Sequence, residues 1–161
     1  MEGLRRTIVG LARVMDVVGG LVLTFMMLVT VMDVILRYLG TPITGTYELV
    51  YLGGALVIAF AMPRTSWDGA NVTVDFVSQA IHGKSRKVMG ACTRILGIVF
   101  FAFLGWNLFR LGNTLLQKQE VSLTLHVPIY PVVYALGVCA IVECLVLLVM
   151  LISDMMEVGH E

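Results

Sequence analysis

Four long apolar segments fill most of this chain and limit what it can fold into. They cover residues 14–36, 47–62, 88–110 and 129–152, with only short polar stretches between them. A helix crosses the hydrocarbon core of a bilayer with about 20 mostly apolar residues. Of the 161 residues, 58% are hydrophobic and 14% are charged, whereas about a quarter of the residues in a soluble domain are charged. The sequence therefore predicts an all-α integral membrane protein, with four transmembrane helices in one domain over residues 1–161.

The second segment is the shortest of the four and is expected to stop at Pro63. Proline lacks the amide N–H that a helix interior uses, and its ring crowds the carbonyl one turn earlier. A span this short is expected to place its ends among the lipid headgroups, with local thinning of the bilayer or snorkelling of its polar side chains.

Basic residues near the ends of the segments predict the orientation of the chain, because cytoplasmic loops collect Lys and Arg. Residues 1–13 contain three arginines, and residues 63–87 contain four basic side chains. The loops on the opposite side hold only Arg37, Arg110 and Lys118. We therefore expect both termini in the cytoplasm, which is consistent with four spans.

Residues 70–87 combine apolar side chains with Asp75, Gln79 and a basic end. This mixture predicts an interfacial amphipathic segment between the second and third helices. An ordinary solvated linker is the alternative, and the sequence leaves both open.

Polar residues within the spans are informative, because an ionised group at the bilayer centre costs about 2.5 kcal/mol or more. In the first span, polar and small residues share one stripe of the helix, which is expected to face protein and not lipid. The stripe consists of Asp16, Gly20, Met27, Thr30, Asp33 and Arg37. Asp33 and Arg37 are four residues apart and are expected to pair near the outer interface. A structural role for this pair is favoured, with a role in transport as the alternative.

The third span carries glycines that share one helix face. They are Gly90, Gly97, Gly105 and Gly112. Glycines in line allow another helix to approach closely. Arg94 lies on the same face. It either points into a helix interface or reaches back to the cytoplasmic headgroups, and the sequence leaves both open.

Glu143 in the fourth span lies at a depth similar to that of Arg94, counted from the cytoplasmic side. An unpaired charge there would be unfavourable, so we hypothesise a salt bridge between Glu143 and Arg94 that joins the third and fourth spans. A proton-carrying Glu143 is the alternative, because proton relays use intramembrane acids.

Several classes of function lack the residues that they need. The formal net charge is zero, whereas a nucleic-acid partner favours a basic face. The sequence has no metalloprotease, P-loop or nucleophile-elbow motif and no Cys/His metal cluster. Its three histidines fall in predicted loops or in the tail, so none is placed to hold a haem at mid-span. We therefore predict no enzyme activity, no cofactor, no metal site and no nucleic-acid partner.

Short motifs along nearly the whole chain are similar to those of one transporter family. They are Asp33, Arg37, Tyr38, Pro42, residues 47–49, residues 72–75, residues 124–128, Pro131 and Gly137. With these motifs the chain resembles the small membrane subunit (DctQ type) of tripartite ATP-independent periplasmic (TRAP) transporters. Asn71 departs from the pattern, because the family often has a histidine just before the valine-aspartate motif of residues 72–75.

The resemblance implies a division of labour among three proteins at the bacterial cytoplasmic (inner) membrane. A soluble periplasmic substrate-binding protein (DctP type) captures an organic anion such as a carboxylate. A large multi-span subunit (DctM type) binds the substrate together with sodium and moves it across the membrane. The small subunit is then a transmembrane scaffold, which supports the large subunit within the membrane lipid and contributes to the surface on which the binding protein docks.

The polar and small residues of the spans are expected to contact the large subunit or to form polar packing within the membrane. They are Asp16, Gly20, Thr30, Asp33, Arg37, Glu48, Gly90, Arg94, Gly97, Gly105 and Glu143. Either the stripe around Asp16 and Thr30 or the glycine face contacts the large subunit, since one of them must hold the four helices together. Docking of the binding protein is expected at Thr41, Pro42, Lys118, Glu120 and His126, with an ordinary solvated loop as the alternative.

Two other classes of membrane protein stay open. An autonomous four-span, proton-coupled exporter would act as a dimer and would use Glu143 as its intramembrane acid. The long central loop argues against it. A membrane anchor for a soluble redox enzyme is the third possibility, which the absence of haem ligands weakens.

Overall fold

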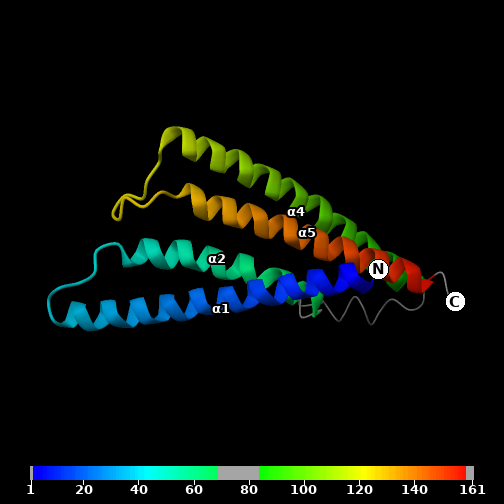
Figure 1. Cartoon of the computed structure of the whole chain (residues 1–161), viewed down its shortest axis with the longest axis horizontal. Helices are drawn as coiled ribbons and strands as arrows, with labels where there is room; N and C mark the ends of the chain where they lie inside the picture. The colour runs from blue at the N-terminus through cyan, green and yellow to red at the C-terminus, as the bar shows by residue number, and fades with distance from the viewer. Residues whose placement is uncertain (1, 69–83, 159–161) are drawn as a thin grey trace.

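Four helices and their short connections make up the described part of the chain, in a computed structural model that describes residues 2–68 and 84–158 (Figure 1). Its helices are α1 (Glu2–Tyr38), α2 (Thr46–Trp67), α4 (Lys84–Lys118) and α5 (Tyr130–Val158). Each contains a stretch long and apolar enough to cross a membrane, over Arg6–Tyr38, Thr46–Trp67, Gly90–Lys118 and Tyr130–Ser153. The all-α fold with four membrane-crossing helices is therefore confirmed. The predicted interfacial segment lies outside the described residues over 70–83, and residues 84–87 form the start of α4.

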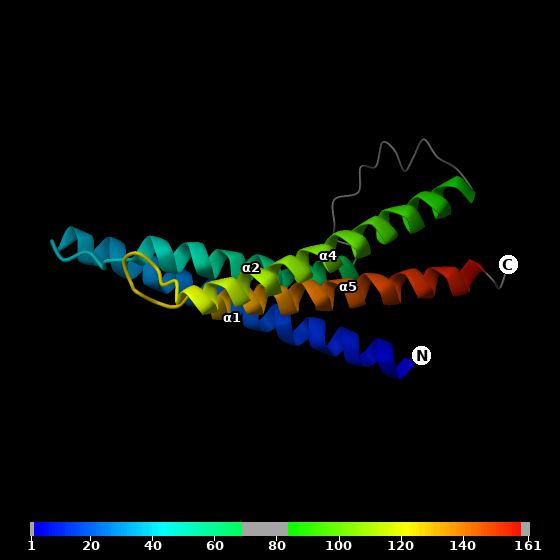
Figure 2. The same ribbon diagram turned by 90° about the horizontal axis from the view of Figure 1, so that it is seen from above.

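The helices form two antiparallel pairs, α1 with α2 and α4 with α5 (Figure 1). The pairs are joined chiefly by α2 against α5, and α1 adds a smaller contact with α5. The start of α1 and the end of α5 lie at one end of the molecule, which we call the terminal end (Figure 2). The opposite end carries the connections of residues 39–45 and 119–129, and we call it the loop end.

The first helix begins earlier than the apolar segment that predicts it. The helix α1 contains 37 residues and is therefore about 55 Å long at 1.5 Å per residue, against about 30 Å for the hydrocarbon core. Ile8, Ala12 and Met15 lie on one face of the helix and are buried. The helix therefore starts before the continuous apolar segment, and one face of this early part packs inside the molecule.

The expectation that the second span stops at Pro63 is wrong, because α2 continues through Pro63 to Trp67. The φ that proline fixes is compatible with a helix, and other groups can satisfy the backbone that it leaves unbonded. The Pro63 side chain is less than 2% exposed. The helix continues for one more turn beyond the buried Pro63. This turn places Ser66 and Trp67 inside the bundle.

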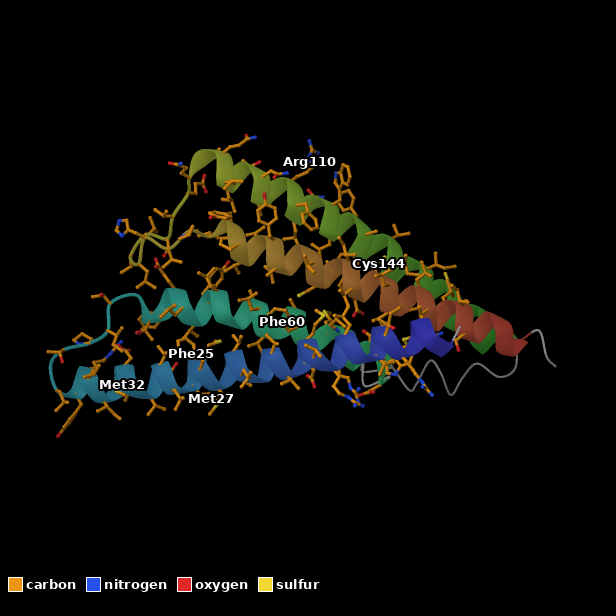
Figure 3. The ribbon with its side chains drawn as sticks, in the orientation of Figure 1. Phe25, Met27, Met32, Phe60, Arg110 and Cys144 are labelled. Atoms are coloured by element: carbon orange, nitrogen blue, oxygen red, sulfur yellow. The ribbon has the colours of Figure 1, made fainter. Side chains whose placement is uncertain are left out.

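The main apolar core lies between α1 and α5. It consists of Ile8 and Met15 from α1 with Cys139, Val142 and Val146 from α5. Side chains of α2, including Phe60 and Trp67, pack against it (Figure 3). The core therefore ties the first and last helices of the chain together through α2.

Candidate functional site

The glycine face of α4 packs against α5. A Cβ added to Gly97 would lie 3.1 Å from Leu147, and one added to Gly105 would lie 3.6 Å from Ala140. At the loop end, Gly112 faces the ring of Tyr134 so closely that a Cβ would lie 2.9 Å from it. This face therefore serves as the seam of the α4–α5 pair.

Gly90 and Arg94, at the start of the same face, differ in what they contact. Nothing lies within 4 Å of a Cβ placed on Gly90. The Arg94 guanidinium donates a hydrogen bond to the backbone carbonyl of Met150 in α5, at 2.9 Å. Of its two predicted placements, Arg94 thus adopts the one in which it points into a helix interface.

The α1–α2 pair has a seam of its own, which was not predicted from the sequence. Nothing lies within 4 Å of a Cβ placed on Gly20, a member of the predicted polar stripe. Its neighbour Gly19 makes the close approach instead, with a Cβ that would lie 3.2 Å from the Cβ of Phe60. Gly53 of α2 accommodates Met26, whose sulfur would lie 2.5 Å from a Cβ there. Gly19 and Met26 are seven residues apart, a spacing that places both on one face of the helix and that could have indicated this seam.

The polar stripe predicted on α1 is largely uncovered by the described helices. Asp16, Gly20 and Thr30 are exposed, and Met27 is 62% exposed and points away from the bundle (Figure 3). The Thr30 hydroxyl donates to the carbonyl of Met26 at 2.8 Å, so its own helix satisfies it. The stripe thus forms a free surface of small and polar residues on α1.

Asp33 is the buried end of this stripe and organises the first loop. Its carboxylate accepts a hydrogen bond from the Arg37 guanidinium at 2.9 Å, which confirms the predicted pair. It also accepts from the backbone N–H of Ile43 at 2.9 Å. The hydroxyl of Thr46 donates to the Ile43 carbonyl at 3.1 Å. One carboxylate therefore closes the connection between α1 and α2.

Glu48, in the first turn of α2, holds the second loop. Its carboxylate accepts hydrogen bonds from the Ser122 hydroxyl and from the backbone N–H groups of Thr124 and Leu125, the last two at 3.0 and 3.1 Å. From the sequence, Glu48 is expected among the residues that contact the large subunit or form polar packing within the membrane, and these partners were not predicted. They lie more than 70 residues away along the chain, beyond the reach of any local pattern.

The two loops also pack directly against each other. Gly45 has a left-handed backbone with φ of 89°, which glycine adopts without strain. A Cβ at this position would lie 2.5 Å from Cγ of Leu125. The loop end is therefore a single interlocked unit, built from Asp33, Gly45, Glu48 and the segment around Leu125.

All five residues predicted for docking lie at this loop end and are exposed. They are Thr41, Pro42, Lys118, Glu120 and His126. Lys118 and Glu120 form an ion pair at 3.7 Å. The second loop is folded back on itself by a bridge between Val121 and Pro128. Both predicted docking segments thus lie at the loop end, where the first loop contacts the second through Gly45 and Leu125.

The hypothesised salt bridge between Glu143 and Arg94 is not present. Glu143 is 2% exposed, and its Oε1 accepts a hydrogen bond of 2.5 Å from the hydroxyl of Ser66 in α2. Among the described residues, Oε2 has no hydrogen-bond partner. Glu143 faces α2, whereas Arg94 approaches α5 from α4 and uses a backbone carbonyl. Similar depth in the membrane therefore did not imply contact, because the two side chains take different helices as partners.

No group of three or more His, Cys, Asp or Glu side chains that could hold a metal ion occurs in residues 2–68 and 84–158. Four of the polar residues described above join helices or loops: Asp33, Glu48, Arg94 and Glu143. These contacts keep the helices and loops in fixed relative positions. The free stripe of α1 and the interlocked loop end are the two candidate interaction sites.

A comparison with protein families matches residues 26–157 to the family described as Tripartite ATP-independent periplasmic transporters, DctQ component. The match covers most of the chain and includes α2, α4, nearly all of α5 and the last third of α1. No curated protein and no solved structure matches the chain.

Proposed function

This chain belongs to the DctQ component family of tripartite ATP-independent periplasmic transporters, and we propose that it acts there as a membrane scaffold. It is a small, multi-pass membrane subunit of such a transporter. In the proposed role it supports a large DctM-type subunit and helps a DctP-type periplasmic protein to dock. The large subunit then carries out sodium-coupled import of an organic anion, such as a carboxylate.

The free stripe on α1 is the observation that carries the scaffold proposal. The glycine seams hold α4 to α5 and α1 to α2 within the chain, so these faces are already occupied. The stripe with Asp16, Gly20 and Thr30 is exposed, although it includes polar groups that are unfavourable against lipid tails. A second membrane protein covering the stripe would remove this exposure, and small residues there would allow a close helix contact.

The intramembrane charges support a scaffold over an autonomous carrier. Asp33 is paired with Arg37 and the first loop. Glu143, the acid that a proton-coupled exporter would need, is 2% exposed and bonded to Ser66. A carrier has to expose its acid to exchange protons, whereas a buried acid bonded to a neighbouring helix contributes to packing. The exporter remains the alternative function.

The proposed orientation puts the loop end in the periplasm and both termini in the cytoplasm of a bacterial inner membrane. The positive-inside rule supports it, since Arg6, Arg13 and Arg64 lie toward the terminal end. In a background without the three native cysteines, we expect Thr41→Cys to react with a membrane-impermeant maleimide in intact cells. Arg13→Cys should react only after lysis, and the reverse pattern would overturn the orientation.

The scaffold role is tested by purifying the tagged chain from its native membranes in mild detergent and identifying the proteins that accompany it. A stoichiometric, much larger multi-span protein is the expected result. A clean homodimer, retained in several detergents, would favour the autonomous exporter instead.

Adjacent residues of α1 provide a matched test of the interface. Gly20 lies in the free stripe, and Leu21 is 65% exposed on a different face at nearly the same depth. We expect Gly20→Trp to reduce the amount of large subunit recovered, and Leu21→Trp to leave it unchanged. Equal recovery with both variants would place the contact elsewhere.

A further inference from the structure

The second loop directs its side chains to opposite sides. Ser122 is 6% exposed and bonds to Glu48, and Leu125 packs against Gly45. Leu123, between them, is 93% exposed. The segment therefore packs Ser122 and Leu125 against the first loop and the start of α2, and it leaves the Leu123 side chain exposed.

Glu48 fixes the backbone on both sides of Leu123. Its carboxylate takes the Ser122 hydroxyl before this residue and the N–H groups of Thr124 and Leu125 after it. Two further hydrogen bonds tighten the turn, from the N–H of Ser122 to the Val127 carbonyl at 2.9 Å and from the N–H of His126 to the Ser122 carbonyl at 3.2 Å. The loop position of Leu123 is thus held by five hydrogen bonds of its neighbours.

A single exposed leucine is common on protein surfaces and by itself has no meaning. The setting of Leu123 differs because the backbone on either side of it is held in place. Val121 and Val127 of the same loop are 45% and 42% exposed and extend its apolar surface. Lys118, Glu120, Thr124 and His126 are exposed along the same connection and its start. An apolar centre with a polar rim of both charges is the arrangement found in protein–protein contacts. A side chain held in its bound geometry also loses less entropy on binding.

We propose that Leu123 is the apolar anchor by which this chain contacts the soluble periplasmic component of its transporter, and that Glu48 is the positioning residue that presents it. The inference rests on the proposed scaffold function. The partner surface should offer a shallow apolar pocket with polar groups around it. Buried apolar anchors of this kind contribute a large share of the binding energy of an interface.

The proposal is tested with proteoliposomes that contain the complete membrane complex, this chain with its large subunit. The soluble component of the same transporter is titrated, and substrate uptake gives its half-saturating concentration and the maximal rate. We compare Leu123→Ser with Leu123→Met, which keeps an apolar side chain. Leu116→Ser is the matched control, since Leu116 is an exposed leucine in the last turn of α4.

We expect Leu123→Ser to raise the half-saturating concentration about tenfold, as for loss of an anchor residue, with the maximal rate preserved. Leu123→Met should restore the native value, and Leu116→Ser should not change it. Glu48→Gln should raise the half-saturating concentration in the same direction, and in combination with Leu123→Ser it should add little, because both changes act on the same contact.

An unchanged half-saturating concentration in Leu123→Ser would overturn the proposal. So would a fall in the maximal rate alone, which would indicate that Leu123 contacts lipid or the large subunit. Failure of the scaffold function itself appears differently, because uptake by the native complex would then not require the soluble component or this chain at all.

Discussion

The hydroxyl of Ser122 donates a hydrogen bond to the carboxylate of Glu48, and this contact joins the α4–α5 connection to the first turn of α2. The same carboxylate accepts two backbone N–H groups of the loop. The two helix pairs meet along α2 and α5 within the bundle, and Glu48 adds a polar link at the loop end. The Glu48 carboxylate therefore helps to fix the position of the second loop relative to α2.

Replacing Glu48 is expected to loosen the second loop without unfolding the helices. In Glu48→Gln the amide nitrogen cannot accept a hydrogen bond, so the Ser122 hydroxyl or one of the N–H groups of Thr124 and Leu125 loses its acceptor. Proteolytic cleavage within residues 119–129 should become several-fold faster, while the helical circular dichroism is retained. Glu120→Gln is the control, because Glu120 is exposed and paired only with Lys118 among the salt bridges described. Equal cleavage rates of the native protein and Glu48→Gln would contradict this role of Glu48 in holding the second loop.

Neighbouring glycines of α1 should respond differently to the same substitution. Gly19→Leu forces a side chain against Phe60, and overpacking of this kind destabilises by about 1–3 kcal/mol. Gly20→Leu meets open space within the chain and should change the unfolding free energy by less than about 0.5 kcal/mol. Denaturant unfolding in detergent measures both. Similar destabilisation by the two variants would show that the seam of α1 is not centred on Gly19.

The buried contact between Ser66 and Glu143 predicts coupled mutational effects. Ser66→Ala removes the hydrogen bond to Glu143 Oε1 and should cost about 1–3 kcal/mol, since it leaves a buried polar group unpaired. Glu143→Leu in the Ser66→Ala background removes the group that was stranded, so the double variant should be more stable than the sum of the single effects. Simple additivity in detergent unfolding experiments would show that the two side chains do not interact.

Arg94 and Glu143 should behave independently, in contrast to the salt bridge expected from their depth. Arg94 donates to the Met150 carbonyl, and Glu143 accepts from Ser66. Residues without a shared contact are usually additive within about 0.5 kcal/mol. The free energies of unfolding of Arg94→Met, Glu143→Gln and the double variant therefore form a near-additive cycle. A coupling free energy well above about 0.5 kcal/mol would instead support the salt bridge between Arg94 and Glu143.

Local sequence patterns were sufficient to predict the four helices and the contacts within one helix, but not where α1 begins or where α2 ends. Segment length and hydropathy predicted four spans, because a bilayer imposes a fixed thickness on any helix that crosses it. The ion pair of Asp33 and Arg37 followed from a spacing of four residues, which places two side chains on one face of a helix. Such properties depend only on neighbours along the chain.

The partners of Glu48, Ser66 and Glu143 could not be predicted in the same way. Glu48 and Ser122 are 74 residues apart, and Ser66 and Glu143 are 77 apart. Their contacts depend on how α2 lies against α5, which no spacing within one helix specifies. The same holds for the choice between the two candidate interfaces of α1 and α4. Helical periodicity identified both faces, but only the packing of the two pairs showed that Gly97, Gly105 and Gly112 are covered by the chain itself and that the stripe with Asp16 and Thr30 is left free.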